Sequence, residues 1–146
     1  MCGSMKIGGA RFDIQQKVPV LNPETGETQE LPWEGHARDD ALSLGNWAVR
    51  KPEERIALAT GYWERSGRGS PLFHPMQDGQ AIRLVEADSM IHAGERAVFV
   101  VTREITEKEV QYALKMGATP HSRHPVIVQT MVPAQSVLPE PETAQA

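Results

Sequence analysis

Apolar and polar side chains alternate along several short segments of this chain. Residues 10–14 alternate between apolar and charged side chains, which is the period of a half-buried strand. An apolar run at 18–21 and a second segment at 27–31 flank residues 22–26, whose proline and glycine are typical of a turn. The pattern therefore predicts one strand followed by a β-hairpin, and residues 32–36 are expected to be a connector.

The second half of the chain contains the strongest strand pattern. Residues 81–87 alternate, and residues 96–102 include four consecutive apolar side chains, which indicates a central strand covered on both faces. The turn sequence at 93–95 predicts that these two strands pair antiparallel. Residues 126–132 have a similar apolar pattern and are expected to form a further strand.

Two neighbouring segments between these strands have helical spacing instead. Residues 39–50 begin with two aspartates, which favour a helix N-terminus, and residues 52–66 begin with Pro52, which suits a first helical turn. The apolar faces of the two segments comprise Ala41, Leu44, Trp47 and Ala48, and Ile56, Ala59, Thr60 and Trp63. The sequence therefore predicts a pair of short adjacent helices.

The clearest local signature belongs to a third helix. Thr106 and Glu109 have the spacing of a capping box, in which each side chain accepts a hydrogen bond from the other residue's backbone amide. Gly117 stands where a residue with left-handed backbone would end the helix. We therefore expect a helix over 107–116.

Together these elements predict an α+β fold. The expected architecture is a small mixed or antiparallel sheet of about five strands, with the helical pair and the third helix packed on it. The strands at 96–102 and 126–132, joined by a helix, would pair in parallel through a right-handed crossover. Residues 5–132 would form a single globular domain, and residues 133–146 have the composition of a disordered tail. Residues 1–4, which precede a second methionine, are interpreted as a cloning remnant.

Composition and charge narrow the classes of function. A chain of 146 residues can bury a core without disulfides or metals, and its net charge of −4 argues against a general nucleic-acid binder. Cys2 is the single cysteine, so no internal disulfide forms, and no apolar run approaches the length that crosses a bilayer. We therefore expect a soluble, cytoplasmic protein that does not associate with membranes.

Five histidines provide the first candidate chemistry. His121 and His124 are three residues apart, a spacing that could share a metal on a helical turn, but the flanking prolines disfavour that helix. We therefore expect no metal site and no cofactor. A small hydrolase that uses His74, His92, His121 and His124 stays open as an alternative, and it requires that these side chains converge with a carboxylate in one pocket.

A second candidate is the glycine-rich segment that follows the predicted helical pair. Glycines expose backbone amides to an anion, and arginine binds phosphate with paired hydrogen bonds. The segment lacks the Walker pattern and follows a predicted helix rather than preceding one. The residues of this expected anion site are Arg65, Gly67, Arg68, Gly69 and Ser70.

A third candidate is aromatic. Trp47 and Trp63 are expected in the core, whereas Trp33 and Tyr62 fall off the predicted apolar faces. Exposed Trp and Tyr side chains are common anchors for protein partners, so Trp33 and Tyr62 are predicted to form a partner-binding surface.

No catalytic motif of a recognisable class occurs in the chain. The sequence therefore favours a small binding or regulatory module without a catalytic centre, whose ligand is a protein partner or a small anionic metabolite. Besides the hydrolase, a weak nucleic-acid binder stays open as an alternative.

Overall fold

The computed structural model describes residues 2–64 and 70–131. Its strands and helices are β1 (Cys2–Ile7), β2 (Ala10–Asp13), β3 (Lys17–Leu21), β4 (Thr28–Arg38), the 3-10 helix η1 (Asp39–Ala41), α1 (Gly45–Ala48), β5 (Glu53–Ala57), β6 (Gly61–Glu64), β7 (Leu72–Pro75), β8 (Gln80–Asp88), β9 (Arg96–Glu104), α2 (Glu107–Lys115), β10 (Arg123–Pro125) and β11 (Ile127–Gln129).

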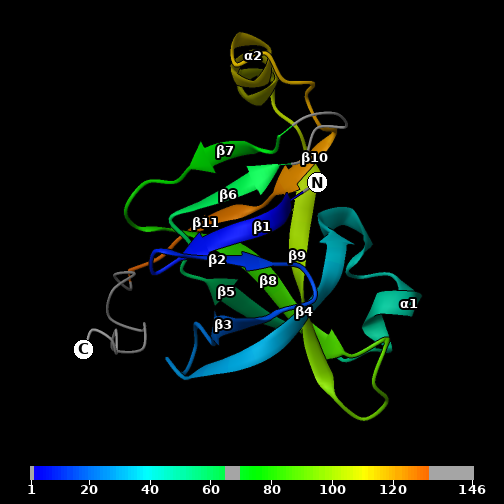
Figure 1. The fold of residues 1–146 in the computed structure, drawn as a ribbon. Helices are drawn as coiled ribbons and strands as arrows, with labels where there is room; N and C mark the ends of the chain where they lie inside the picture. Colours follow the sequence, from blue (N-terminus) through cyan, green and yellow to red (C-terminus); the bar gives the residue numbers. More distant parts are fainter. Residues whose placement is uncertain (1, 65–69, 132–146) are drawn as a thin grey trace, which may run out of the picture.

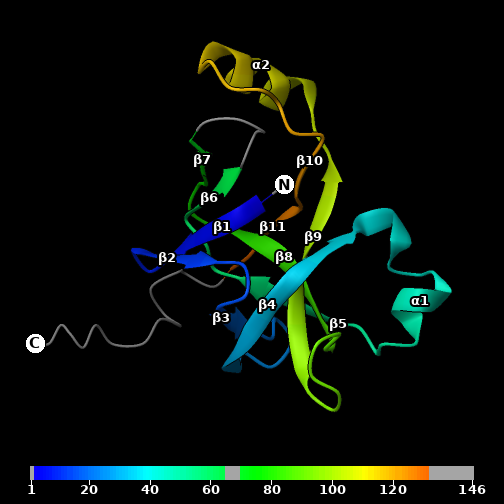
Figure 2. The same cartoon turned by 45° about the vertical axis from the view of Figure 1, so that its right-hand side comes forward.

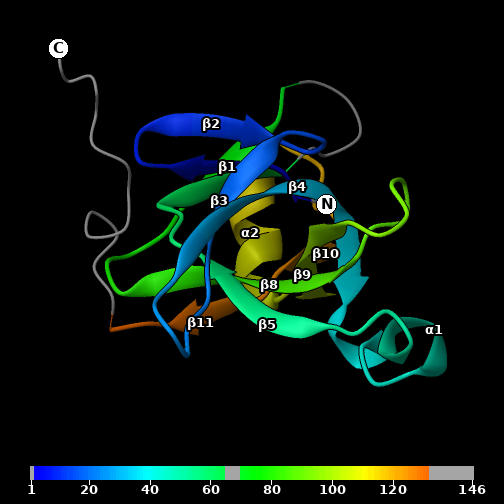
Figure 3. The same ribbon diagram turned by 90° about the horizontal axis from the view of Figure 1, so that it is seen from below.

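Five of these strands close into a barrel. The hydrogen-bonded order is β9-β4-β3-β5-β8, and β8 pairs with β9 to complete the ring (Figure 3). The pairing between β4 and β9 is parallel, and the other four pairings are antiparallel. β10 and β11 extend the barrel sheet by pairing antiparallel with β9 and β8 respectively.

A second sheet of four strands, in the order β2-β1-β6-β7, lies over one end of the barrel (Figure 1). Its inner face and the barrel interior share one apolar core. Met5 and Tyr62 from the second sheet pack in the same cluster as Trp33, Leu84 and Val100 from the barrel. The second sheet is therefore joined to the barrel by buried apolar contacts as well as by the chain connections.

The strands β8 and β9 are buried on both faces, as their long apolar runs predicted. Leu84 and Val100 point into the barrel, whereas Val85 and Phe99 belong to a second cluster on its outside. The segment with η1 and α1 covers this outer cluster, and the Trp47 ring lies edge-on to Phe99 at 5.1 Å. The short α1 therefore acts as a cover for the barrel wall.

The predicted α+β fold is wrong. Strands account for 50% of the described residues and helices for 13%, and this part of the chain contains α1 and α2 as its only α-helices. The second helix of the expected pair does not form, because residues 53–57 and 61–64 are the strands β5 and β6. Residues 56–59 are all apolar, so they satisfy helical spacing by coincidence. Their side chains alternate between two apolar clusters, as a strand requires.

The predicted parallel pair is also wrong. Residues 123–129 return beside β9 and β8 in antiparallel strands, and the parallel partner of β9 is β4. β4 includes residues 32–36, which we expected to be a connector. The β3–β4 hairpin, the antiparallel β8–β9 pair and the capped helix α2 are confirmed.

The N-terminal residues 2–4 belong to the second sheet through β1. Cys2 and Ser4, which we interpreted as part of a cloning remnant, are buried in β1. The expected disordered tail at 133–146 lies outside the described residues. Within the described ranges, no helix is long and apolar enough to cross a membrane.

The helix α2 stands apart from the rest of the fold. It lies between β9 and β10 in the chain and extends beyond the second sheet, away from the barrel, in both Figure 1 and Figure 2. Ala113 is the one buried residue within α2, whereas Leu114 and Met116 are exposed. The contacts that hold α2 to the second sheet are therefore mainly polar and aromatic, and they are described below.

Candidate functional site

The hairpin formed by β6 and β7 supplies side chains to both faces of the second sheet. Tyr62 pairs with His74 across the hairpin, and Trp63 pairs with Phe73. Because successive side chains of a strand point to opposite faces, these two pairs lie on opposite sides of the sheet. Tyr62 and His74 are buried on the inner face, whereas Trp63 and Phe73 are partly exposed on the outer face.

The outer face combines two aromatic rings with two cations. The Trp63 and Phe73 ring centroids lie 4.7 Å apart with an interplanar angle of 52°. The Arg11 guanidinium carbon lies 4.5 Å from the Trp63 centroid, and the Lys6 Nζ lies 5.9 Å from the Phe73 centroid. Both distances are within the range of cation–π attraction. The four side chains therefore form one surface, called here the outer aromatic face.

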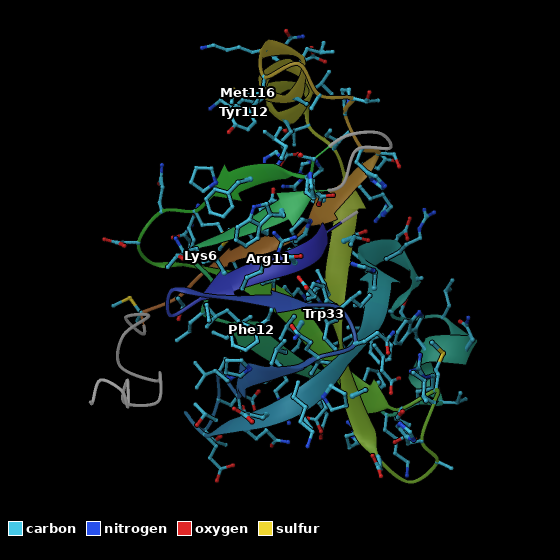
Figure 4. The ribbon with its side chains drawn as sticks, viewed as in Figure 1. Lys6, Arg11, Phe12, Trp33, Tyr112 and Met116 are labelled. Carbon is cyan, nitrogen blue, oxygen red and sulfur yellow. The ribbon has the colours of Figure 1, made fainter. Side chains whose placement is uncertain are left out.

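The strand register explains why the two cations lie together. Lys6 of β1 pairs directly with Arg11 of β2, so both side chains project from the same face of the sheet, where Figure 4 shows them side by side. Phe12, the neighbour of Arg11, points the other way and packs against the core. The alternation that predicted this strand thus also fixes the face on which Arg11 lies.

The Phe73 ring reaches its position because residue 61 is a glycine. A Cβ atom at Gly61 would lie 2.2 Å from Phe73 Cζ and 2.9 Å from the His74 carbonyl oxygen. Neither contact is sterically possible without a shift of ring or backbone. The missing side chain therefore allows the ring to lie directly on the backbone of β6.

A pocket of about 250 Å³ borders the outer aromatic face. It is lined by Gly3, Ser4, Arg11, Asp13, Ile14, Trp63 and Pro71. The Asp13 carboxylate accepts hydrogen bonds from the Ser4 hydroxyl at 2.6 Å and from the Arg11 Nε at 3.1 Å. Both hydrogen bonds lower the pKa of Asp13, and the bond from Ser4 has the larger effect. The pocket therefore presents a fixed carboxylate beside a guanidinium and an indole ring.

The inner face of the same hairpin forms a buried polar cluster. The Tyr62 and His74 rings are stacked, with centroids 5.0 Å apart and planes 4° from parallel. The Tyr62 hydroxyl shares a hydrogen bond of 3.0 Å with the Nδ1 of His124, and the His124 ring lies edge-on to His74 at 4.9 Å. Burial lowers the pKa of both histidines, that of His124 to about 4. Both rings are therefore neutral near neutral pH.

The buried cluster continues into α2. Arg103 of β9 donates two hydrogen bonds, of 2.8 and 2.7 Å, to the Glu109 carboxylate, which lies 3.5 Å from the Nδ1 of His124. Burial alone would raise the pKa of Glu109, but the bonds from Arg103 and the Thr106 amide lower it to about 2. The Tyr112 hydroxyl donates to the Phe73 carbonyl at 3.1 Å. The bonds from Arg103 hold α2 to β9 of the barrel, and the bond from Tyr112 holds it against β7 at the edge of the second sheet.

The structure brings two of the four candidate hydrolase histidines together. His74 and His124 meet beside Glu109, whereas His92 lies in the connection between β8 and β9. His121 accepts a hydrogen bond from the Arg123 amide through its Nδ1. Among the described residues, no group of three or more histidine, cysteine, aspartate or glutamate side chains could hold a metal ion.

The other predicted site residues belong to the expected anion site and to the expected partner-binding surface. Arg65, Gly67, Arg68 and Gly69 lie outside the described residues, and Ser70 is exposed just before β7. The predicted partner-binding residues are not at the surface. Trp33 is 0% exposed and donates its indole N–H to the Gly35 carbonyl, and Tyr62 is 4% exposed. Neither ring is therefore available as an exposed anchor.

Sequence reasoning missed the outer aromatic face. Trp63 was assigned to the core of a helix, and Lys6 and Phe73 were not singled out. The one usable signal was the alternation at 10–14, which places Arg11 and Asp13 on the face opposite Phe12. No family model matches the chain, and no curated protein or solved structure is significantly similar to it.

Proposed function

We propose that this chain is a binding module that holds a small anionic ligand with a flat ring on its outer aromatic face. The observation that carries the proposal is the Arg11 guanidinium placed over the Trp63 ring, 4.5 Å from its centroid, at the rim of a pocket. A guanidinium held in this way presents a flat cationic surface on which another ring can stack, and it can also donate to an anion.

The hydrogen-bonding capacity of the two cations supports the proposal. Within the described residues, only the Nε–H of Arg11 has a protein acceptor, so its remaining N–H groups are available to a ligand. Among the described residues, Lys6 has no carboxylate within ion-pair distance. Its Nζ lies over the Phe73 ring instead. An anionic group near these two side chains would form charge-assisted hydrogen bonds.

The alternative of a small hydrolase is favoured by one observation, the convergence of His74 and His124 with Glu109. Their burial weighs against it, because these histidines are 8% and 2% exposed and leave little room for a substrate. Their lowered pKa values leave the imidazoles as weak bases. Among the described side chains that contact it, the cluster also lacks a serine or cysteine nucleophile. A binding role for the outer face is therefore the better supported function.

The proposal is tested by calorimetric titration with three probes: inorganic phosphate, thymidine and thymidine monophosphate. We expect the monophosphate to bind more tightly than either half alone, because it supplies both the ring and the charge. Arg11→Ala should weaken its binding at least tenfold, as expected for the loss of a charge-assisted contact.

The chain offers a matched control for this substitution. Arg38 bonds to Asp40 two residues ahead through its Nε, as Arg11 bonds to Asp13, but it lies on β4 away from the pocket. Arg38→Ala should therefore leave binding unchanged. Absence of binding to the unmodified protein, or equal weakening by both substitutions, would contradict the proposal.

A further inference from the structure

We infer that the ligand of the outer aromatic face is a single-stranded nucleic acid, held through two successive nucleotides, rather than a free nucleotide. The inference rests on the proposed function and specifies its ligand. It derives from the repetition of one chemical unit on this face, which is a cation placed over an aromatic ring.

The face contains two such units side by side. Arg11 lies over Trp63, and Lys6 lies over Phe73. A free nucleotide has one base and would occupy one unit, whereas a dinucleotide matches both rings and both cations. The two units are contributed by all four strands of the second sheet, so one rigid element fixes their spacing.

The two rings are adjacent and form one aromatic surface. The Trp63 and Phe73 centroids are 4.7 Å apart, so the rings contact each other. The tilt of 52° between the rings means that the two bases would lie at an angle rather than in a continuous stack. Such unstacked bases occur in single strands, whereas a duplex keeps its base faces covered by neighbouring bases.

The charges of the face indicate weak binding without sequence preference. Lys6 and Arg11 are opposed by Asp13, whose carboxylate is already bonded to Ser4 and Arg11. The chain as a whole has a net charge of −4, so long-range attraction to a polyanion is small. Affinity would therefore come from stacking at this face, which tolerates any base, and from local contacts to the two flanking phosphates.

The experiment compares thymidine monophosphate with thymidylate oligomers of two, four and eight residues, by fluorescence titration and calorimetry on the whole chain. We expect the dimer to bind about tenfold more tightly than the monophosphate, because the second base stacks on the second unit. An abasic oligomer of equal charge serves as the control for electrostatic attraction alone and should bind at least tenfold more weakly than the thymidylate tetramer.

Substitutions separate the two units. Arg11→Ala should weaken the monophosphate and the oligomers alike, whereas Lys6→Gln and Phe73→Leu should weaken the oligomers more than the monophosphate and so reduce the advantage of the oligomers. Lys17→Gln on β3, outside the second sheet, is the matched control for Lys6→Gln and should change nothing. Because Lys6→Gln alters a partly exposed side chain on a strand that stays paired, it keeps the test valid even if Phe73→Leu does not fold.

The outcomes distinguish the inference from the proposed function. Equal affinity for the monophosphate and the dimer would overturn the inference and leave the proposed function standing. Equal affinity for the abasic oligomer and the tetramer would do the same, provided that the monophosphate still binds. No binding of any probe would overturn both. A dimer advantage that disappears in Lys6→Gln and persists in Lys17→Gln would support both.

Discussion

The hairpin β6–β7 places one aromatic pair on each face of the second sheet, and the two pairs have opposite surroundings. On the inner face, Tyr62 and His74 stack in parallel and are nearly fully buried; the Tyr62 hydroxyl hydrogen-bonds His124, and the His74 ring lies edge-on to His124. On the outer face, Trp63 and Phe73 are tilted, partly exposed and covered by cations.

Under the proposed function, this difference separates residues that stabilise the fold from residues that bind the ligand, at four neighbouring positions of one hairpin. The Tyr62 hydroxyl is hydrogen-bonded within the protein and the His74 ring contacts Tyr112, so the inner pair contributes to the core and helps to hold α2 in place. The outer pair has polar neighbours with unused hydrogen-bond donors, so it can interact with a ligand. Substitutions on the two faces should therefore have different consequences, and the predictions below begin with the largest.

Truncation of the inner ring should have the largest effect on stability. Tyr62→Ala should lower the free energy of unfolding by about 3–5 kcal/mol, the usual cost of deleting a buried aromatic ring. Trp63→Ala should cost about 1–2 kcal/mol, because solvent can fill the space that an outer side chain leaves. Urea denaturation monitored by circular dichroism measures both values. Equal losses would show that the two faces contribute equally to the core.

Gly61→Ala tests the link between the two faces. The added Cβ would collide with the Phe73 ring and with the His74 carbonyl, so we expect a loss of about 1–3 kcal/mol from strain. The same substitution should displace the Phe73 ring and weaken ligand binding. Gly3→Ala is the matched control for stability in the same sheet, because a Cβ there meets no atom within 4 Å. A Gly61→Ala protein as stable as the Gly3→Ala protein would contradict the described position of Phe73.

The pH dependence of stability should reveal two opposing groups of the inner face. His124 has a pKa lowered to about 4, so the unfolded chain binds a proton between about pH 4 and 6.5 that the folded chain does not. This group therefore destabilises the fold as pH falls. Burial raises the pKa of Glu64 to about 7, so the folded chain retains a proton between pH 4.5 and 7 that the unfolded chain releases. This group destabilises the fold as pH rises.

Glu64→Gln removes one of these two contributions. The stability of this variant relative to the unmodified protein should increase from pH 4.5 to pH 7.5 by roughly 2–3 kcal/mol, since one pKa unit corresponds to about 1.4 kcal/mol and burial raises the pKa of Glu64 from 4.5 to about 7. Urea midpoints at the two pH values provide the comparison. Glu104→Gln, at the exposed end of β9, is the control. A difference that does not vary with pH would mean that Glu64 is ionised in the folded protein throughout.

The helix cap should give the smallest effect on stability. Thr106→Ala removes the side-chain oxygen that accepts from the Glu109 amide at 3.3 Å, which should cost about 1 kcal/mol. Because α2 packs loosely, the loss should be local and appear as roughly fivefold faster amide hydrogen exchange in α2. Exchange in β9 should be unaffected. Unchanged exchange in α2 would mean that the cap does not stabilise this helix.

The contrast between α2 and β6 shows which parts of the fold could be predicted from the sequence. Capping is a local property, so Thr106, Glu109 and Gly117 were sufficient to predict the helix and its end. β6 depends on pairing with β7 and with β1, which is distant in sequence, and the apolar run at 56–59 that precedes β6 fitted a helix equally well. Local patterns therefore predicted the well-capped helix and the β3–β4 and β8–β9 hairpins, but not β6 or the barrel.

The candidate site was beyond sequence reasoning for the same reason. The outer aromatic face exists because Lys6, Arg11, Trp63 and Phe73, from four strands, are brought to one side of a sheet. Alternation along each strand fixes a face, but the order of the strands decides which side chains become neighbours. That order follows from the shared core between the sheet and the barrel, which no single segment encodes.

The most direct test of the central claim uses the three tryptophan side chains as internal reporters. Trp63 lies on the outer aromatic face, Trp33 is buried in the barrel core, and Trp47 covers the barrel wall. A titration with thymidine monophosphate, followed in a proton–nitrogen correlation spectrum, should shift the indole signal of Trp63 and leave the other two unchanged. A Trp63 signal that stays in place while another indole signal moves, or no movement of any of the three, would contradict the assignment of ligand binding to this face.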